Sequence, residues 1–164
     1  MTLTHSLPFL LALGWTGVQA ADVGSAAPGC AVPTLSGDAH VDPAALPGKV
    51  VYLDFWASWC VPCAKSFPFI EQMHRDLKSR GLEVVAINLD EETRDAEGFL
   101  AKHPVTFTIG ADPEGKCPRL YKVKGMPTSY LIDRSGRIHD IHEGFESGDA
   151  TKVRAQVETL LSQP

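Results

Sequence analysis

Positive charge is scarce in this sequence of 164 residues. Lysine and arginine together number 15 against 20 aspartates and glutamates, which gives a formal net charge of −5. That balance gives no support to binding of nucleic acids or anionic membranes, which attract basic surfaces. The sequence also contains no internal repeat and no low-complexity stretch. With 44% hydrophobic and 21% charged residues, it is typical of a single globular domain.

Charged side chains are absent from the first twenty residues. This segment holds a short apolar run at residues 7–13 and ends with small residues at Val18 and Ala20. Such a run, followed by small residues at the −3 and −1 positions, is typical of a secretory signal peptide. An uncleaved membrane anchor is the alternative, but the run is shorter than the roughly 20 apolar residues that cross a bilayer. We therefore expect residues 1–20 to be a signal peptide and residues 21–164 to form an exported, periplasmic domain.

Cysteine is rare as well. Of the four cysteines, Cys60 and Cys63 form a C-x-x-C motif, whereas Cys30 and Cys117 stand alone. Four are too few for a small disulfide-dense scaffold, and a chain of this length can bury a core without them. A zinc site needs further ligands, usually a second C-x-x-C or paired histidines, and the sequence offers no such spacing. We expect neither a metal nor another cofactor.

From residue 50 onward, the apolar pattern alternates between strands and helices. Residues 50–56 and 82–89 are nearly continuous apolar runs, typical of strands buried on both faces. Between them the spacing predicts a helix from about residue 60 to residue 80, capped by Gly81, whose inner face carries Phe67, Ile70, His74 and Leu77. Further helices are expected over 91–103, 117–121 and 150–161, and further strands over 107–109, 129–132 and 137–142.

This order of elements predicts the α/β class. Strand–helix–strand units require a parallel core sheet covered by helices, and a late hairpin adds antiparallel strands at one edge. The expected architecture is a three-layer sandwich with a mixed central sheet. Residues 21–48 are rich in glycine, proline, alanine and aspartate, which predicts an N-terminal extension with a loose β-hairpin.

The C-x-x-C motif lies where a predicted strand gives way to a predicted helix. A cysteine in the first turn of a helix faces unpaired backbone N–H groups and the positive end of the helix dipole. Both favour the thiolate, which is the nucleophilic form. Cys60 is therefore expected to be the exposed attacking cysteine, and Cys63, one turn later, to resolve the mixed disulfide. A purely structural short-loop disulfide is the alternative.

The residues around this motif resemble those of the thioredoxin superfamily, and within it the exported TlpA-like thiol–disulfide oxidoreductases. The stretch Asp-Phe-Trp-Ala-Ser-Trp-Cys-Val-Pro-Cys at residues 54–63 carries the resemblance. Pro68 stands where the family's active-site helix has its kinking proline. Residues 125–128 look like the family's cis-proline element, and residues 131–136 like the strand and turn that follow it. The similarity covers about residues 27–161 and implies a thioredoxin-like fold.

The resemblance also implies roles for individual residues. Asp54 stands where thioredoxin has a buried aspartate that exchanges protons with the second cysteine, and burial would raise its pKa. The alternative is an aspartate at a strand end that faces solvent. Pro127 is implied to follow a cis peptide bond and to present the preceding backbone to substrate, whereas an ordinary trans proline is the alternative. The implied substrate-binding residues are Trp59, Val61, Pro62, Met126 and Pro127.

The implied function is disulfide reduction, with Cys60 attacking, Cys63 resolving and Asp54 managing the proton. The implied partners are client proteins with disulfides or thiols and a membrane electron donor of the DsbD type, and we expect a monomer. Because direction depends on reduction potential, a thiol oxidase or isomerase with the same dithiol remains an alternative. A metal-binding copper chaperone on the same fold is another, although those relatives use C-x-x-x-C.

Three further positions, Ser66, Cys30 and Cys117, bear on this expectation. Reductases dedicated to cytochrome maturation often carry glutamate three residues after the second cysteine, where this chain has Ser66. Ser66 therefore argues against a dedicated role in cytochrome maturation, and the sequence does not identify the client protein. Cys30 and Cys117 are expected either to form a structural disulfide, since export favours oxidation, or to remain two buried free thiols.

Overall fold

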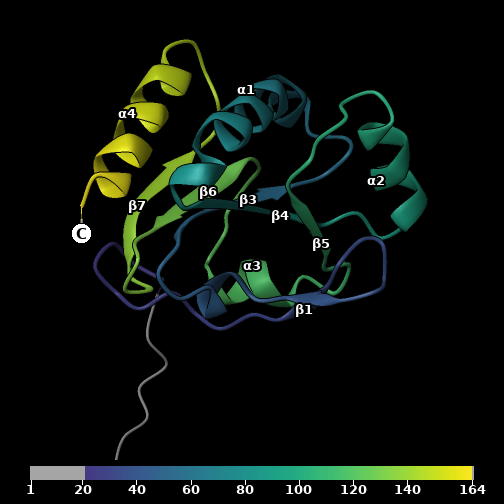
Figure 1. The fold of residues 1–164 in the computed structure, drawn as a ribbon. Helices are drawn as coiled ribbons and strands as arrows, with labels where there is room; N and C mark the ends of the chain where they lie inside the picture. Colours follow the sequence, from purple (N-terminus) through teal and green to yellow (C-terminus); the bar gives the residue numbers. More distant parts are fainter. Residues whose placement is uncertain (1–20, 164) are drawn as a thin grey trace, which may run out of the picture.

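The computed structural model describes residues 21–163 (Figure 1). The predicted signal peptide, residues 1–20, lies outside the described residues. No helix between residues 21 and 163 is both long and apolar enough to cross a membrane.

A mixed sheet of five strands forms the centre of the domain, in the order β5-β4-β3-β6-β7. β3 and β4 are parallel, as are β4 and β5, whereas β6 pairs antiparallel with β3 and β7 antiparallel with β6. This topology confirms the predicted mixed sheet with an antiparallel hairpin at one edge. The strands are β3 (Val50–Trp56), β4 (Leu82–Asn88), β5 (Thr108–Ala111), β6 (Thr128–Ile132) and β7 (Ile138–Glu143).

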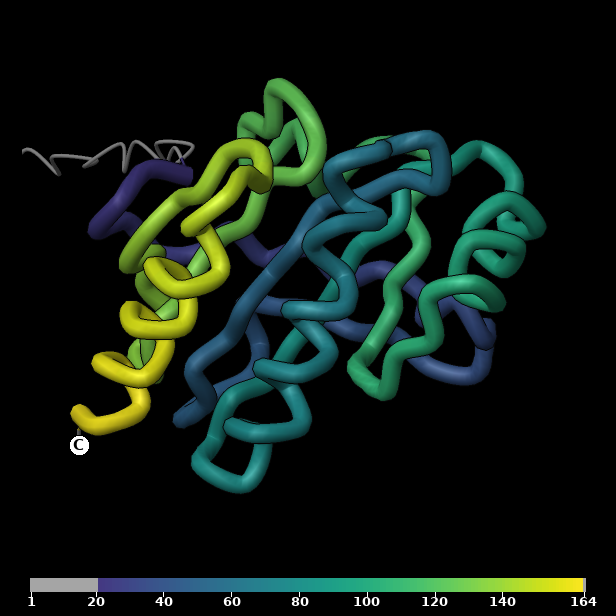
Figure 2. Tube along the Cα trace, turned by 90° about the horizontal axis from the view of Figure 1, so that it is seen from above, coloured from purple at the N-terminus to yellow at the C-terminus, as the bar shows by residue number. Residues whose placement is uncertain are grey.

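Helices cover both faces of the sheet, which completes the predicted three-layer sandwich. α1 (Val61–Leu77) and α4 (Asp149–Leu161) lie on one face, and α3 (Lys116–Leu120) lies on the other (Figure 1). Seen from above, α4, α1 and α2 (Thr93–Leu100) lie side by side in that order (Figure 2). The active-site motif therefore begins a helix that runs between two neighbours, α4 and α2.

Buried side chains form two clusters, one on each face of the sheet. β3 contributes to both because successive residues of a strand point to opposite faces. Tyr52 and Trp56 join the cluster that contains α1, whereas Leu53 and Phe55 join the opposite one. All seven residues of β3 are buried, including Asp54, which interrupts the apolar run. The predicted inner face of α1 is confirmed, since Phe67, Ile70, His74 and Leu77 are all buried.

The N-terminal extension crosses the face of the sheet opposite α1, close to α3 (Figures 1 and 2). It contains the predicted hairpin, in which β1 (Val32–Pro33) pairs antiparallel with β2 (His40–Val41). A β-carbon at Gly110 of β5 would lie 2.7 Å from Cγ2 of Val32. Glycine at this position therefore allows the extension to lie directly against the sheet.

A disulfide between Cys30 and Cys117 joins this extension to α3, across a sequence separation of 87. The two Cα atoms lie 5.5 Å apart, and both cysteines are buried. The backbone N–H of each cysteine donates to an aspartate side chain. Cys30 donates to Asp42 Oδ1 at 3.0 Å, and Cys117 donates to Asp112 Oδ2 at 2.7 Å. The bridge therefore links two segments that are already positioned by hydrogen bonds.

Replacing both Cys30 and Cys117 with serine is expected to lower the free energy of unfolding by about 2–4 kcal/mol, because the unfolded chain regains the entropy of a long open loop. Urea denaturation of the oxidised proteins would measure this loss. Disulfide exchange should be retained, since Cys60 and Cys63 belong to the cluster on the other face of the sheet. An unchanged unfolding midpoint would show that the bridge does not stabilise the fold.

Candidate active site

Cys60 is the N-cap residue of α1, immediately beyond the turn that follows β3. Its backbone is extended, with φ −79° and ψ 100°, and its Sγ accepts the backbone N–H of Cys63 at 3.2 Å. In the structure the two cysteines form a disulfide, with Cα atoms 5.3 Å apart. The sulfur of Cys60 therefore occupies the place where a capping oxygen normally satisfies a free helix N–H group.

This position favours a negative charge on the Cys60 sulfur once the disulfide is reduced. The first N–H groups of a helix have no intrahelical acceptor, and the helix dipole adds a partial positive charge at the same end. α1 is 17 residues long, so the dipole is that of a full helix. Pro62 stands in the first turn, where its missing N–H removes no helical hydrogen bond. Such a position is suited to a nucleophilic thiolate.

The prediction that Cys60 is exposed is wrong for this oxidised state. Cys60 is only 4% exposed and Cys63 is fully buried, because the disulfide and the capping contact hold the Cys60 sulfur back against the start of the helix. The neighbours on either side, Trp59 and Val61, are each 69% exposed. Access to Cys60 is through a cleft of about 500 Å³ that it lines together with both of these side chains.

Asp90 holds the turn that precedes Cys60. Its Oδ2 accepts the backbone N–H of Ser58 at 3.0 Å, and its Oδ1 accepts the Ser58 hydroxyl at 3.0 Å. Asn88 in turn donates its side-chain N–H to Asp90 Oδ2 at 2.8 Å. The parallel register places Trp56 beside Asn88, so the clamp joins the carboxyl ends of β3 and β4. This contact was not predicted from the sequence, although two polar residues at the end of an apolar strand were the available signal.

Asp54 is fully buried on the same face of the sheet as Tyr52, Trp56 and the two active-site cysteines. The alternative of a solvent-facing aspartate is therefore excluded by its burial. Ser129 donates its hydroxyl to Asp54 Oδ1 at 2.9 Å, and the Tyr52 hydroxyl donates to Ser129 at 2.8 Å. Within residues 21–163, Asp54 Oδ2 has no hydrogen-bond partner.

Burial raises the pKa of Asp54 from 3.8 to about 7, because desolvation disfavours the charged carboxylate, while the hydrogen bond from Ser129 acts in the opposite direction. A carboxyl group with this pKa can both hold and release a proton near neutral pH. Ser129 was not among the sequence predictions. Its only signal was a hydroxyl residue at the start of the strand expected over residues 129–132.

The peptide bond between Met126 and Pro127 is cis. β6 begins immediately afterwards, and its pairing of Thr128 with Phe55 places Pro127 at the end of the sheet from which β3 leads to Cys60. Pro127 is buried and Met126 is half-buried. Both line a smaller hollow of about 280 Å³. This hollow shares no lining residue with the cleft at Cys60. This element therefore lies at the active-site end of the sheet.

Comparison with known families covers almost the whole described domain. The model of the Redoxin family matches residues 22–161. The chain belongs to the Redoxin family. Among individual relatives, it is 31% identical to the thiol–disulfide oxidoreductase ResA of Bacillus subtilis over 145 residues, which cover 84% of this chain and 80% of ResA. It is 35% identical to ResA of Oceanobacillus iheyensis over 125 residues, covering 74% of this chain but 65% of that relative.

A solved structure extends the comparison to three dimensions. The crystal structure of a Chlorobium tepidum protein, provisionally assigned as the thiol:disulfide interchange protein DsbE, superposes with a TM-score of 0.82. The two are 49% identical, and the match covers 86% of this chain and 99% of the other. These relatives confirm the thioredoxin-like fold and the expected resemblance. Together with the paired Cys60 and Cys63, they identify the Redoxin-family chain as a thiol–disulfide oxidoreductase.

Proposed function

We propose that this Redoxin-family protein reduces disulfides of client proteins in the periplasm. The Cys60 thiolate attacks one sulfur of a client disulfide, which forms a mixed disulfide and releases the other client sulfur as a thiolate. Cys63 then attacks Cys60, so that the client leaves with both sulfurs reduced and the Cys60–Cys63 disulfide remains. The structure corresponds to this final oxidised state.

The observation that carries the proposal is the N-cap position of Cys60, which stabilises the attacking thiolate. Asp54 complements it, because a carboxyl group with a pKa of about 7 on the same face of the sheet is suited to accept the proton of Cys63 when that thiol attacks. The cis element at Met126 and Pro127, with Trp59, Val61 and Pro62, is proposed to hold the client segment beside the reacting sulfurs.

Two features support an oxidising compartment. The Cys30–Cys117 disulfide is of a kind that persists in exported proteins and is rare in the cytosol. The uncharged segment at residues 1–20 has the pattern of a signal peptide. In such a compartment the reduced form of the protein must be regenerated. We propose that a membrane electron donor of the DsbD type does this, and that the protein is a monomer.

Equilibration of the purified protein with dithiothreitol or glutathione buffers tests the direction of the reaction. We expect a reduction potential near the roughly −270 mV of thioredoxin, because a reductase must give up its electrons readily. Alkylation followed by mass spectrometry would count the reduced Cys60 and Cys63 at each buffer ratio. A potential near the roughly −120 mV of DsbA would overturn the proposal in favour of a thiol oxidase.

A further inference from the structure

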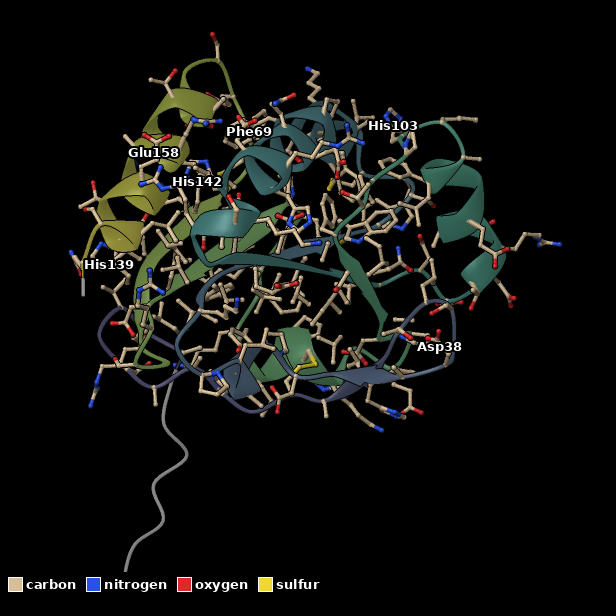
Figure 3. The ribbon with its side chains drawn as sticks, in the orientation of Figure 1. Asp38, Phe69, His103, His139, His142 and Glu158 are labelled. Carbon is tan, nitrogen blue, oxygen red and sulfur yellow. A yellow bond between two sulfur atoms is a disulfide. The ribbon has the colours of Figure 1, made fainter. Side chains whose placement is uncertain are left out.

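The cleft at Cys60 has two walls of different origin. One wall is the start of α1 with the turn before it, where Trp59, Cys60 and Val61 lie. The other wall is α2 and the chain that leaves it, and Figure 3 shows His103 there, between α2 and α1. At about 500 Å³, the cleft is within the usual size range of ligand sites. The α2 wall consists of Arg94, Asp95, Gly98, Phe99, Lys102 and His103.

The α2 wall is positively charged within an acidic protein. Arg94 and Lys102 face a single carboxylate in the cleft, that of Asp95, whereas the whole chain carries a formal charge of −5. In the part of the chain that the structure describes, no ion pair involves Arg94 or Lys102. Two cations without an ion-pair partner beside the reactive sulfur are complementary to a negatively charged client segment.

A glycine separates the two cations. Arg94 and Gly98 are four residues apart in α2, so they lie in one row along the helix, and Lys102 lies in the turn that follows the end of the helix. Beyond the backbone of its own helix, a β-carbon at Gly98 would meet no atom of the described residues within 4 Å, and the Gly98 backbone is ordinary helix. Alanine would fit there and would stabilise the helix by about 0.5–1 kcal/mol. The glycine instead leaves an open notch between the two cations.

Aromatic side chains join the α2 wall to the core. The Phe99 ring lies 4.8 Å from the ring of buried Trp56 and 5.0 Å from that of Phe67, measured between centroids. The centroid of the His103 ring lies 4.5 Å from that of Phe99. The α2 wall is thus packed against the same core as the active-site helix, and its position relative to Cys60 is defined.

We propose that the α2 wall determines client specificity, by binding a client segment that carries a carboxylate side chain within a few residues of its reactive cysteine. The carboxylate is held between Arg94 and Lys102, and the client backbone passes over the Gly98 notch. This inference rests on the proposed reductase function, because it concerns which disulfides reach Cys60.

The test uses three disulfide-bonded peptides that differ only in the residues flanking one cysteine, which are glutamate, glutamine or lysine. We expect kcat/KM to be about fivefold to thirtyfold higher for the glutamate peptide than for the lysine peptide, since two partly exposed ion pairs contribute about 1–2 kcal/mol together. The preference should shrink in high salt. The double variant R94E/K102E should reverse it, so that the lysine peptide becomes the better substrate.

The matched control is K49E/K78E, which makes the same change of charge at two exposed lysines at the opposite end of β3 and α1. It should behave like the unmodified protein. Equal rates for all three peptides, or equal effects of both double variants, would overturn the proposal. The glutamine peptide distinguishes failure of the specificity proposal from failure of the proposed reductase function. If the protein does not reduce this peptide at all, the reductase function itself is contradicted.

Substitutions at Gly98 provide an independent test of the proposal. Gly98→Leu should raise KM for the glutamate peptide severalfold with little change in kcat, because its side chain fills the notch, whereas Gly98→Ala should have a much smaller effect. If Gly98→Leu leaves KM unchanged, the client does not cross α2. Efficient reduction of glutathione disulfide, together with equal kcat/KM values for the three peptides, would also overturn the assignment of a polypeptide client.

Discussion

Replacing Cys60 with serine is expected to abolish disulfide reduction, whereas replacing Cys63 with serine is expected to stop the reaction at a mixed disulfide with the client. Only the Cys60 sulfur is at the N-cap, where the Cys63 N–H and the helix dipole stabilise its thiolate. A serine hydroxyl in its place does not ionise near neutral pH. Insulin reduction would measure the first effect, and mass spectrometry without reductant would detect the trapped complex of the second.

The Cys30→Ser/Cys117→Ser double variant is the control, since it removes two sulfurs, both from the other face of the sheet. It should retain turnover at temperatures where it stays folded. If the Cys60→Ser protein reduced insulin while the Cys63→Ser protein did not, the roles of attacking and resolving cysteine would be reversed. Burial argues against that outcome, because Cys63 is fully buried and only Cys60 lines the cleft.

Local and periodic patterns were sufficient to predict the fold and to single out Cys60 and Cys63, which form a disulfide in the structure. The apolar run at residues 50–56 became β3 without a change of bounds, and the helical spacing after it became α1. The last expected turn of that helix is instead a 3₁₀ turn, Lys78–Arg80, which ends at Gly81 in a left-handed conformation with φ 103°. The cap was therefore predicted correctly, because left-handed backbone strongly favours glycine.

The parts of the site that could not be predicted depend on contacts between distant segments. Ser58 and Asp90 are 32 residues apart and meet only because β3 and β4 pair in parallel. Ser129 reaches Asp54 across a separation of 75 residues through the antiparallel pairing of β6 with β3. The expected helix over 91–103 is shorter, Thr93–Leu100, since Glu92 is extended, and its charged face could not be assigned to the cleft without the sheet that positions it.

Asp54→Asn is expected to make the protein more stable near neutral pH and at the same time a slower reductase. The folded protein keeps a proton on Asp54 up to about pH 7, whereas the unfolded chain loses it near pH 3.8. Raising the pH between these values therefore lowers the free energy of unfolding, because the folded state binds the extra proton. The full effect, roughly 4 kcal/mol at most, is reached above pH 7. Asparagine does not titrate, so the Asp54→Asn protein does not show this fall in the free energy of unfolding.

Urea unfolding at several pH values would measure the difference between the two proteins. It should be smallest near pH 4 and should grow until about pH 7. Ser129→Ala offers a comparison in the opposite sense, because losing its hydrogen bond raises the pKa of Asp54 and extends the fall in stability to higher pH. A difference that did not vary with pH would contradict the buried titrating carboxyl group.

The rate of the second chemical step decides whether Asp54 acts on protons or only fills space. Loss of a positioned general base typically slows a step by about 100-fold or more. Resolution of the mixed disulfide by Cys63 should slow in the Asp54→Asn protein at pH 7 and recover as rising pH ionises the Cys63 thiol directly. A residue with a purely structural role would not combine higher stability with a slower, pH-dependent step. Equal resolution rates in both proteins across the pH range would remove Asp54 from the mechanism, while leaving Cys60 and its helix as the source of reactivity.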